Sequence, residues 1–294
     1  MELRVLQYFL AIAREESISK AAEYLHISQP TLSRQIRDLE DQLGTLLFER
    51  GSRKISLTED GLLLRKRAEE IIRLVDKTES EIISGETELN GDIYIGCGET
   101  EGMTLIARAM KRMQHEHPYV QFHLHSGNAE DIIERLEKGL IDFGVLIGKH
   151  DVSKYNYIKV PFKDIWGVLM RKDSPLANRD TVTIEDLINL PLILSTQEIK
   201  NNQIFQYLLE NDNYHIVATY NLIYNASLMV KEGVGYAIGL DKLINTDCTS
   251  ELCFKPLKPK ITNEIILVWK KYQHFSKASQ YFLNTVQSIL SDLS

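Results

Sequence analysis

A narrow apolar stripe predicts a helix near the start of the chain. Its members follow one another at spacings of four, three and four residues: Leu32, Ile36, Leu39 and Leu43. This spacing is typical of one buried helix face, so we expect all four side chains in a core. Ser28 stands where a helix N-cap belongs, and Pro30 is tolerated in the first turn.

The opposite face of this predicted helix is polar or basic first and acidic only later. It carries Pro30, Ser33, Arg34 and Arg37, followed by Asp38 and Asp41. A helix that enters the DNA major groove by its N-terminus needs this order, because its first turns meet base edges and phosphates. Gln29 can pair with adenine, and Arg34 can reach guanine or a phosphate. A solvated amphipathic helix has the same pattern. The flanking segments are therefore needed to distinguish it from a DNA-binding helix.

The flanking segments favour a helix-turn-helix followed by a wing. A short helix is predicted before the stripe from Ile18, Ala21, Ala22 and Leu25, and only a brief turn separates the two helices. After the stripe, Leu46, Leu47 and Phe48 are expected to return to the core. The basic tip at 50–54 and the alternation at 55–57 suit a wing that grips phosphates or the minor groove.

Residues 1–60 resemble the winged helix-turn-helix of LysR-type transcriptional regulators. The resemblance rests on Met1–Arg4, Phe9, Ser28-Gln29-Pro30, Leu32-Ser33, Ile36, Leu39-Glu40, Leu43-Gly44, Leu47–Arg50 and Leu57-Thr58. It implies a DNA-binding domain at 1–58 that contacts double-stranded DNA at a partly palindromic promoter site. The candidate DNA-binding residues are Ser28, Gln29, Pro30, Thr31, Ser33, Arg34, Arg37, Arg50, Arg53 and Lys54.

The overall charge does not point to DNA. The chain carries a formal net charge of −7, and its first 60 residues hold eight Lys and Arg against ten Asp and Glu. Attraction to DNA must therefore come from the local placement of a few basic residues, doubled by dimerisation: Arg34, Arg37, Arg50, Arg53 and Lys54. We expect modest non-specific affinity and a strong reliance on two half-sites.

A long helix is predicted at 59–88. Small or apolar residues recur in a heptad pattern: Leu64, Ala68, Ile71, Val75, Thr78 and Ile82. A helix packed on a core is one interpretation, but the surrounding positions are densely charged. We therefore interpret the segment as a dimerisation helix, which corresponds to the linker helix of the resembled family.

The remaining residues, 89–294, alternate predicted strands and helices, which is typical of an α/β fold with βαβ units. We expect strands at 92–97, 119–125, 143–147, 165–171, 192–194, 216–220, 233–239 and 264–269, and helices at 104–114, 129–138, 202–211, 226–232 and 275–293. The pattern resembles the effector-binding region of LysR-type regulators, itself similar to periplasmic solute-binding proteins. It implies lobe I at 89–161 and 267–294, lobe II at 162–266, and a cleft between them.

Candidate effector-binding residues lie in turns between predicted strands and helices, where α/β folds hold ligands. They are Thr100, Glu101, Gly127, Asn128, Ser195, Thr196, Tyr224 and Asn225, of which the family resemblance implies Thr100, Asn128, Ser195 and Thr196. Ordinary helix capping would explain the same residue types. Glu99 and Glu101 stand beside a predicted helix N-terminus and would repel anions there. We therefore expect an effector that is not a simple dicarboxylate and that carries an amine or several hydroxyls.

Other sequence features narrow the class of protein. The sequence contains no secretion signal and no apolar run of the roughly 20 residues that cross a bilayer, so we expect a cytoplasmic protein without a membrane partner. Three cysteines indicate a reducing compartment, although Cys248 and Cys253 leave a redox pair open. No cofactor, metal site or catalytic motif is predicted, so we do not expect an enzyme.

A homodimer or homotetramer is expected, with RNA polymerase as a further candidate partner. The alternative is a solute-binding or enzymatic domain fused to a DNA-binding module.

Overall fold

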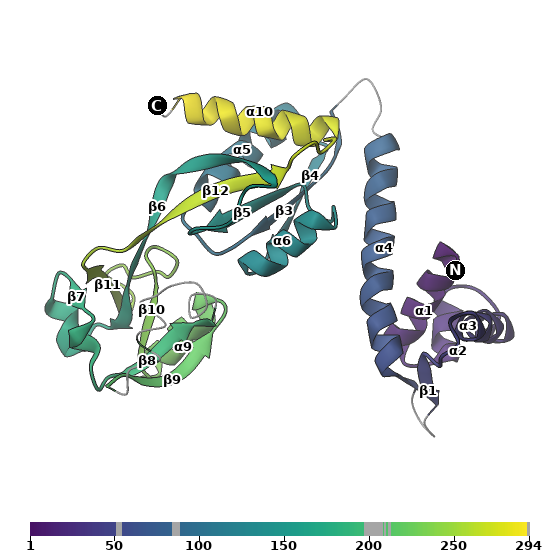
Figure 1. The fold of residues 1–294 in the computed structure, drawn as a ribbon, viewed down its shortest axis with the longest axis horizontal. Helices are drawn as coiled ribbons and strands as arrows, with labels where there is room; N and C mark the ends of the chain where they lie inside the picture. Colours follow the sequence, from purple (N-terminus) through teal and green to yellow (C-terminus); the bar gives the residue numbers. More distant parts are fainter. Residues whose placement is uncertain (51–54, 84–88, 197–207, 209, 211–212, 293–294) are drawn as a thin grey trace. The chain divides into compact units, whose positions relative to one another are not determined.

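The computed structural model describes residues 1–50, 55–83, 89–196, 208, 210 and 213–292 (Figure 1). The chain divides into two compact units, Met1–Ile83 and Ser84–Ser294. Each unit has its own hydrophobic core and is described by itself.

The N-terminal unit is a three-helix cluster with a two-stranded wing and a long final helix. Its elements are α1 (Leu3–Glu15), α2 (Ile18–Tyr24), α3 (Gln29–Leu43), β1 (Phe48–Arg50), β2 (Ile55–Leu57) and α4 (Glu59–Ile83). Strands β1 and β2 pair antiparallel, with Phe48 opposite Leu57. The core between the helices includes Phe9, Ile12, Leu32, Ile36, Leu39, Leu47 and Ala68. The predicted helix-turn-helix and wing are therefore present.

Two residues of the predicted core are not in it. Leu43 is 44% exposed and Leu46 is 66% exposed, so the expectation that both would be buried is wrong. The reason is the end of α3. Gly44 takes the left-handed conformation with φ of 71°, which turns the chain away immediately after Leu43. Leu47 and Phe48 then fill the space against α1.

Helix α4 contacts the N-terminal core through part of the predicted heptad seam. Ala68 is fully buried in that core, and Leu64 packs against it. The interpretation of Ala68 as a seam position toward a second chain is therefore wrong. The predicted seam residue Ile71 is exposed, as are Leu63 and Leu74, and these three lie within about 80° of one another on the helix. The side chain of the predicted seam residue Ile82 lies outside the described side chains.

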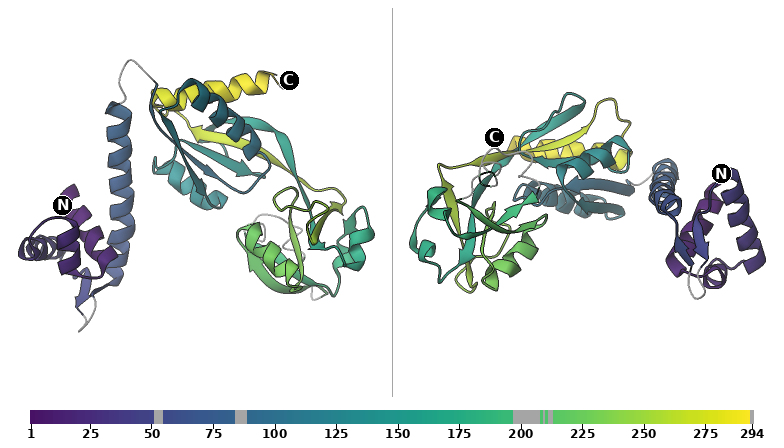
Figure 2. Two further views of the ribbon diagram at one scale, coloured as in Figure 1. Left: turned by 180° about the vertical axis from the view of Figure 1, so that it is seen from behind. Right: turned by 60° about the horizontal axis from the view of Figure 1, so that its bottom comes forward.

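The first lobe of the C-terminal unit is a sheet covered by helices on both faces. It contains β3 (Gly91–Cys97), α5 (Met103–Glu116), β4 (Val120–Ser126), α6 (Ala129–Glu137), β5 (Phe143–Ile147) and the closing helix α10 (Lys277–Asp292). Strands β4, β3 and β5 are parallel neighbours. Helices α5 and α10 bury one face of the sheet, and α6 packs on the other (Figure 2).

The second lobe is a smaller mixed sheet. Its elements are η1 (Pro175–Asn178), β7 (Val182–Thr183), η2 (Glu185–Leu187), β8 (Pro191–Ser195), β9 (His215–Tyr220), α9 (Ile223–Lys231), β10 (Tyr236–Leu240) and β11 (Leu252–Lys258). Strand β8 is parallel to β9 and β10. The sequence did not predict β7 or β11. The helix predicted at 202–211 falls almost entirely outside the described residues.

Two long strands run through both lobes and connect them (Figure 1). They are β6 (Tyr155–Arg171) and β12 (Thr262–Lys270), which pair antiparallel with each other. Their register shifts where Glu264 pairs with Lys163 and Ile265 pairs with Val160, which leaves Pro161 and Phe162 as extra residues on β6. This irregularity marks the boundary at which the two lobes meet. The exact residue bounds assigned to the domains stay a prediction.

Candidate functional site

The first turns of α3 present the polar face that the sequence predicted. Ser28 caps the helix, because its hydroxyl oxygen accepts the Thr31 N–H at 3.4 Å. Leu32, Ile36 and Leu39 hold the opposite face in the core. Gln29, Pro30, Thr31, Arg34 and Arg37 are consequently exposed, and Ser33 is half-buried.

Arg34 is available to a ligand outside the chain. Its side chain is 82% exposed, and its Nε lies 3.9 Å from the nearest oxygen of Asp38. An exposed pair at this distance contributes at most about 1 kcal/mol, so replacing Asp38 with a DNA phosphate or guanine costs little.

A buried carboxylate connects this helix to the wing. Glu40 lies on the core side of α3, and its Oε1 accepts the Leu47 N–H at 2.8 Å and the Phe48 N–H at 3.3 Å. Glu40 therefore fixes the beginning of β1 relative to α3. The sequence analysis assigned Glu40 no role. Its burial could have been inferred, because it follows Ile36 by one helical turn and therefore lies on the apolar face of α3.

The wing tip is described only in part. Arg50 ends β1, and nothing is described of its side chain. Arg53 and Lys54 lie outside the described residues. Their contribution to DNA binding, like that of the other nominated positions, stays a prediction.

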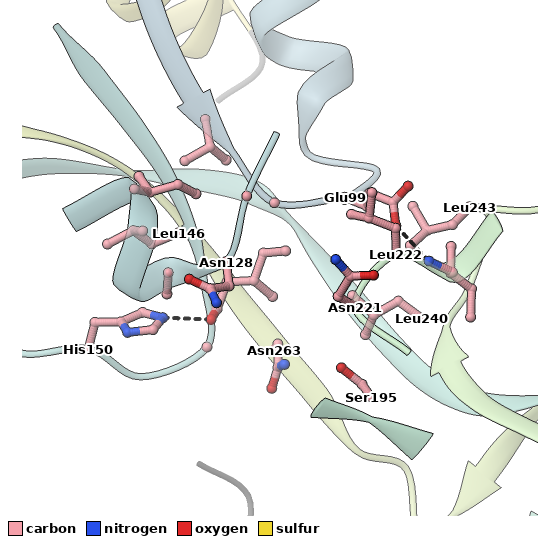
Figure 3. Close-up of a pocket in the computed structure, with 18 of the residues that line it drawn as sticks. Glu99, Asn128, Leu146, His150, Ser195, Asn221, Leu222, Leu240, Leu243 and Asn263 are labelled. Atoms are coloured by element: carbon pink, nitrogen blue, oxygen red, sulfur yellow. Dashed lines mark hydrogen bonds between the residues drawn. The ribbon is translucent and has the colours of Figure 1, made fainter. Parts of the chain in front are cut away.

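A cavity of about 570 Å³ lies between the two lobes of the C-terminal unit (Figure 3). Lobe I contributes Glu99, Asn128, Leu146 and His150, and lobe II contributes Ser195, Asn221, Leu222, Leu240 and Leu243. Asn263 lies on the crossing strand β12 between them. A volume of this size falls within the range of small-molecule sites, and both polar and apolar side chains line it.

Local structure fixes the polar groups of this cavity. Asn128 is the N-cap of α6, and its Oδ1 accepts the Asp131 N–H at 2.8 Å. Its side-chain amide group retains two N–H donors. His150 Nε2 lies 2.8 Å from the carbonyl oxygen of Ile147. Because a carbonyl only accepts, Nε2 carries the proton and Nδ1 is left to interact elsewhere.

The cavity gathers four of the eight nominated effector residues. Gly127, Asn128, Ser195 and Thr196 line it, the last with its hydroxyl donating to the Tyr220 carbonyl at 3.1 Å. Sequence reasoning did not nominate Glu99, His150, Asn221 or Asn263, because nothing in the local sequence shows which turns meet across the lobes.

The other four nominated residues lie away from the cavity lining. Thr100 is buried, and its hydroxyl oxygen accepts the Gly102 N–H at 3.0 Å. Glu101 lies at the junction of the lobes, 4.0 Å from Lys242. Tyr224 and Asn225 belong to the first turn of α9, and Tyr224 is well exposed. The role of all eight residues in effector binding stays a prediction.

A buried acid lies beside Thr100 at the junction of the lobes. Asp164 on β6 is 2% exposed, and burial raises the pKa of its carboxyl group to about 6. The Thr100 hydroxyl and the Glu101 backbone N–H face it and partly oppose that shift. Strand β6, one of the two strands that join the lobes, thus carries a carboxyl group whose pKa lies well above its usual range.

Two of the three cysteines lie where burial disfavours the reactive thiolate. Cys97 is buried in β3, Cys253 is partly buried in β11 and Cys248 is exposed. Burial raises the pKa of the Cys97 and Cys253 thiols, which favours the unreactive protonated form. In the described part of the chain, no group of three or more His, Cys, Asp or Glu side chains is arranged to hold a metal ion.

The two units match two models of one protein family. Residues 3–62 match the bacterial regulatory helix-turn-helix protein model of the lysR family, and residues 86–290 match the LysR substrate binding domain. The chain belongs to the LysR family of transcriptional regulators. It carries the helix-turn-helix and the substrate binding domain of that family, which is a family of regulators rather than enzymes.

Curated relatives agree with this assignment. A hydrogen peroxide-inducible genes activator from Pectobacterium carotovorum is 35% identical over 197 residues, which cover 66% of this chain and 64% of that protein. The match therefore spans slightly less than two thirds of this relative. An uncharacterized HTH-type transcriptional regulator from Bacillus subtilis, YybE, is 28% identical over 99% of this chain and 100% of its own length.

Solved structures show the same fold at low sequence identity. CbnR, a LysR family transcriptional regulator, superposes with a TM-score of 0.76 and 17% identity over 98% of this chain and 99% of its own. Full-length CbnR complexed with its target DNA gives a TM-score of 0.75, 18% identity and the same shares of the two chains. None of the helices described here has the length and apolar character needed to span a membrane.

Proposed function

We propose that a small molecule binds in the cavity between the lobes and that its binding changes how recognition helices engage a partly palindromic promoter site. The observation that supports this most directly is the cavity itself, which both lobes and the crossing strand line. A ligand there contacts both lobes at once, so it binds best at one particular angle between them. Its binding energy then favours that angle over others.

The crossing strands supply the means of movement. Only β6 and β12 join the lobes through paired strands among the described elements, and their pairing is irregular around Pro161. Bending at such a position leaves the hydrogen bonds within each lobe intact. Small rotations there change the relative orientation of surfaces far from the cavity.

Dimerisation would bring two recognition helices to one DNA site. Leu63, Ile71 and Leu74 form an exposed apolar stripe on α4, which suits contact with the same helix of a second copy. A homodimer, paired into a homotetramer, would then bind half-sites whose spacing or bend depends on the effector. We further expect that this cytoplasmic complex contacts RNA polymerase at its promoters.

Selection of bound genomic fragments, with and without a metabolite library, tests this function. We expect a preferred DNA site whose recovery or footprint changes with at least one library fraction. The matched control is the Arg34→Ala chain, which retains the cavity and should lose the preferred site. Recovery of the same site under all ligand conditions would contradict the proposed regulation, and the absence of a preferred site would contradict specific binding.

A further inference from the structure

Glu99 links the two lobes through a single hydrogen bond. This residue follows β3 in lobe I, and its Oε2 accepts the backbone N–H of Ile223 at 2.8 Å (Figure 3). Ile223 is the first residue of α9 in lobe II. Because the two residues belong to different lobes, 124 positions apart in the sequence, this contact requires the lobes to lie close together.

The contact replaces a helix cap that α9 does not have locally. Its N-cap residue is Leu222, whose aliphatic side chain cannot accept a hydrogen bond. A free N–H at a helix N-terminus needs an acceptor, and a carboxylate is favoured there by the helix dipole. Glu99 supplies that carboxylate from the other lobe. It therefore occupies the position at which the carboxylate of an organic acid would bind.

The remaining charges at the cavity favour the same conclusion. Besides Glu99, its described lining contains the acids Glu130 and Glu264 against a single lysine, Lys149. Glu264 is paired with Lys159 at 3.0 Å, outside the lining. Asn128, Ser195 and Asn263 offer amide and hydroxyl groups to a ligand. These groups suit hydroxyl or amine partners and offer no concentrated positive charge.

We propose that the Glu99 carboxylate caps the N-terminus of α9 from the other lobe, and that the cleft consequently binds an uncharged or cationic polar effector rather than an organic acid. The inference rests on the proposed function for the identity of the site. At the N-terminus of α9, the two lobes are held together by the protein's own Glu99 carboxylate. The effector binds in the space bordered by Asn128, Ser195 and Asn263. Its contacts with both lobes add to the Glu99 contact and stabilise the closed arrangement of the lobes.

Amide hydrogen exchange on the full-length chain without effector tests the Glu99 contact. Glu99→Ala should raise the exchange rate of the Ile223 amide at least fivefold. Glu99→Gln, which keeps an acceptor oxygen, should raise it less. The control Glu130→Ala removes a carboxylate from the same cavity and should leave Ile223 unchanged. Equal exchange in wild type and Glu99→Ala would overturn the proposal.

Acetate and succinate test the exclusion of acids. At matched ionic strength, either anion should restore protection of Ile223 in Glu99→Ala, because the N-terminus of α9 is then vacant. Neither should bind in the wild-type cleft, as measured by calorimetry. Binding of succinate to wild type as tightly as to Glu99→Ala would overturn the proposal.

The two proposals fail separately. If the metabolite library yields an organic acid that acts on wild type, the inference about Glu99 is wrong and effector control stands. If Ile223 depends on Glu99 but no ligand alters DNA binding, effector control fails and the interlobe contact stands. The exchange experiment needs no effector, so its result does not depend on finding one.

Discussion

Replacing Glu40 should destabilise the DNA-binding unit more than any exposed substitution in it. Glu40 is buried, and one of its oxygens accepts hydrogen bonds from the N–H groups of Leu47 and Phe48. Glu40→Ala removes both bonds and leaves the two backbone donors at the start of β1 without that acceptor. The wing then loses its fixed position relative to α3.

The size of the effect follows from the two bonds. A hydrogen bond to a charged group contributes about 1.5–3 kcal/mol, and a buried donor left unpaired costs a similar amount. The 2.8 Å bond to Leu47 should contribute most, and the 3.3 Å bond to Phe48 less. We therefore expect Glu40→Ala to lower the free energy of unfolding of this unit by about 2–4 kcal/mol. Glu40→Gln keeps an acceptor oxygen and should cost about half as much.

Native-state hydrogen exchange on the full-length chain measures this effect unit by unit. The amides of α1 and α3 report the stability of the N-terminal unit, and those of β3 and β5 report the other unit. The matched control is Glu49→Ala, the exposed acid in β1, which should change stability by less than about 0.5 kcal/mol. If Glu40→Ala were as mild as Glu49→Ala, the assignment of Glu40 as the connection between helix and wing would be refuted.

Four further predictions concern DNA binding, the lobe junction, dimerisation and the start of α4. Arg34→Ala should cost about 1–3 kcal/mol in specific DNA binding without changing stability, and an unchanged footprint would contradict the placement of the recognition helix. Burial raises the pKa of Asp164 from 3.8 to about 6, so the folded state holds this proton more tightly than the unfolded state. The contribution of Asp164 to stability should therefore fall by up to about 3 kcal/mol as pH rises from 4 to 7, and urea titrations should show that Asp164→Asn lacks this component. Leu74→Lys should weaken self-association at least tenfold in sedimentation equilibrium, whereas an unchanged dissociation constant would exclude this face of α4 from the interface. Gly61→Ala would place a methyl group 2.1 Å from the Leu47 carbonyl oxygen, so a loss of about 1–3 kcal/mol is expected in the same exchange experiment.

Local patterns predicted the elements well where one face is buried. The apolar stripe of α3 and the cap at Ser28 both follow from spacing and residue type over fewer than 20 residues. The strand predicted at 143–147 coincides with β5, because a strand that is buried along its length is a short continuous apolar run.

The errors arose where distant residues decide the structure. Strand β6 begins at Tyr155, ten residues before the predicted start, because its first half is stabilised by pairing with β12 rather than by its own alternation. Leu43 was assigned to the core because its spacing is correct, but α3 extends one turn beyond the side chains it packs against. Periodicity does not reveal where a core ends.

The cavity was predicted only in outline for the same reason. Each turn that lines it has ordinary capping residues, such as Asn128, which give no sign of which other turn they face. The contact between Glu99 and Ile223 depends on the closure of two lobes that separate strands build. The sequence shows that the turn after β3 is acidic, but it does not show that Glu99 contacts Ile223.

A hydroxyl-radical footprint of the full-length chain on its selected promoter, with and without the ligand recovered from the library, tests the central claim most directly. We predict two protected half-sites separated by one DNA turn of about 10 base pairs or a multiple of it, with a pattern that shifts when the ligand is added. Protection confined to one site, or an identical pattern in both conditions, would contradict the account.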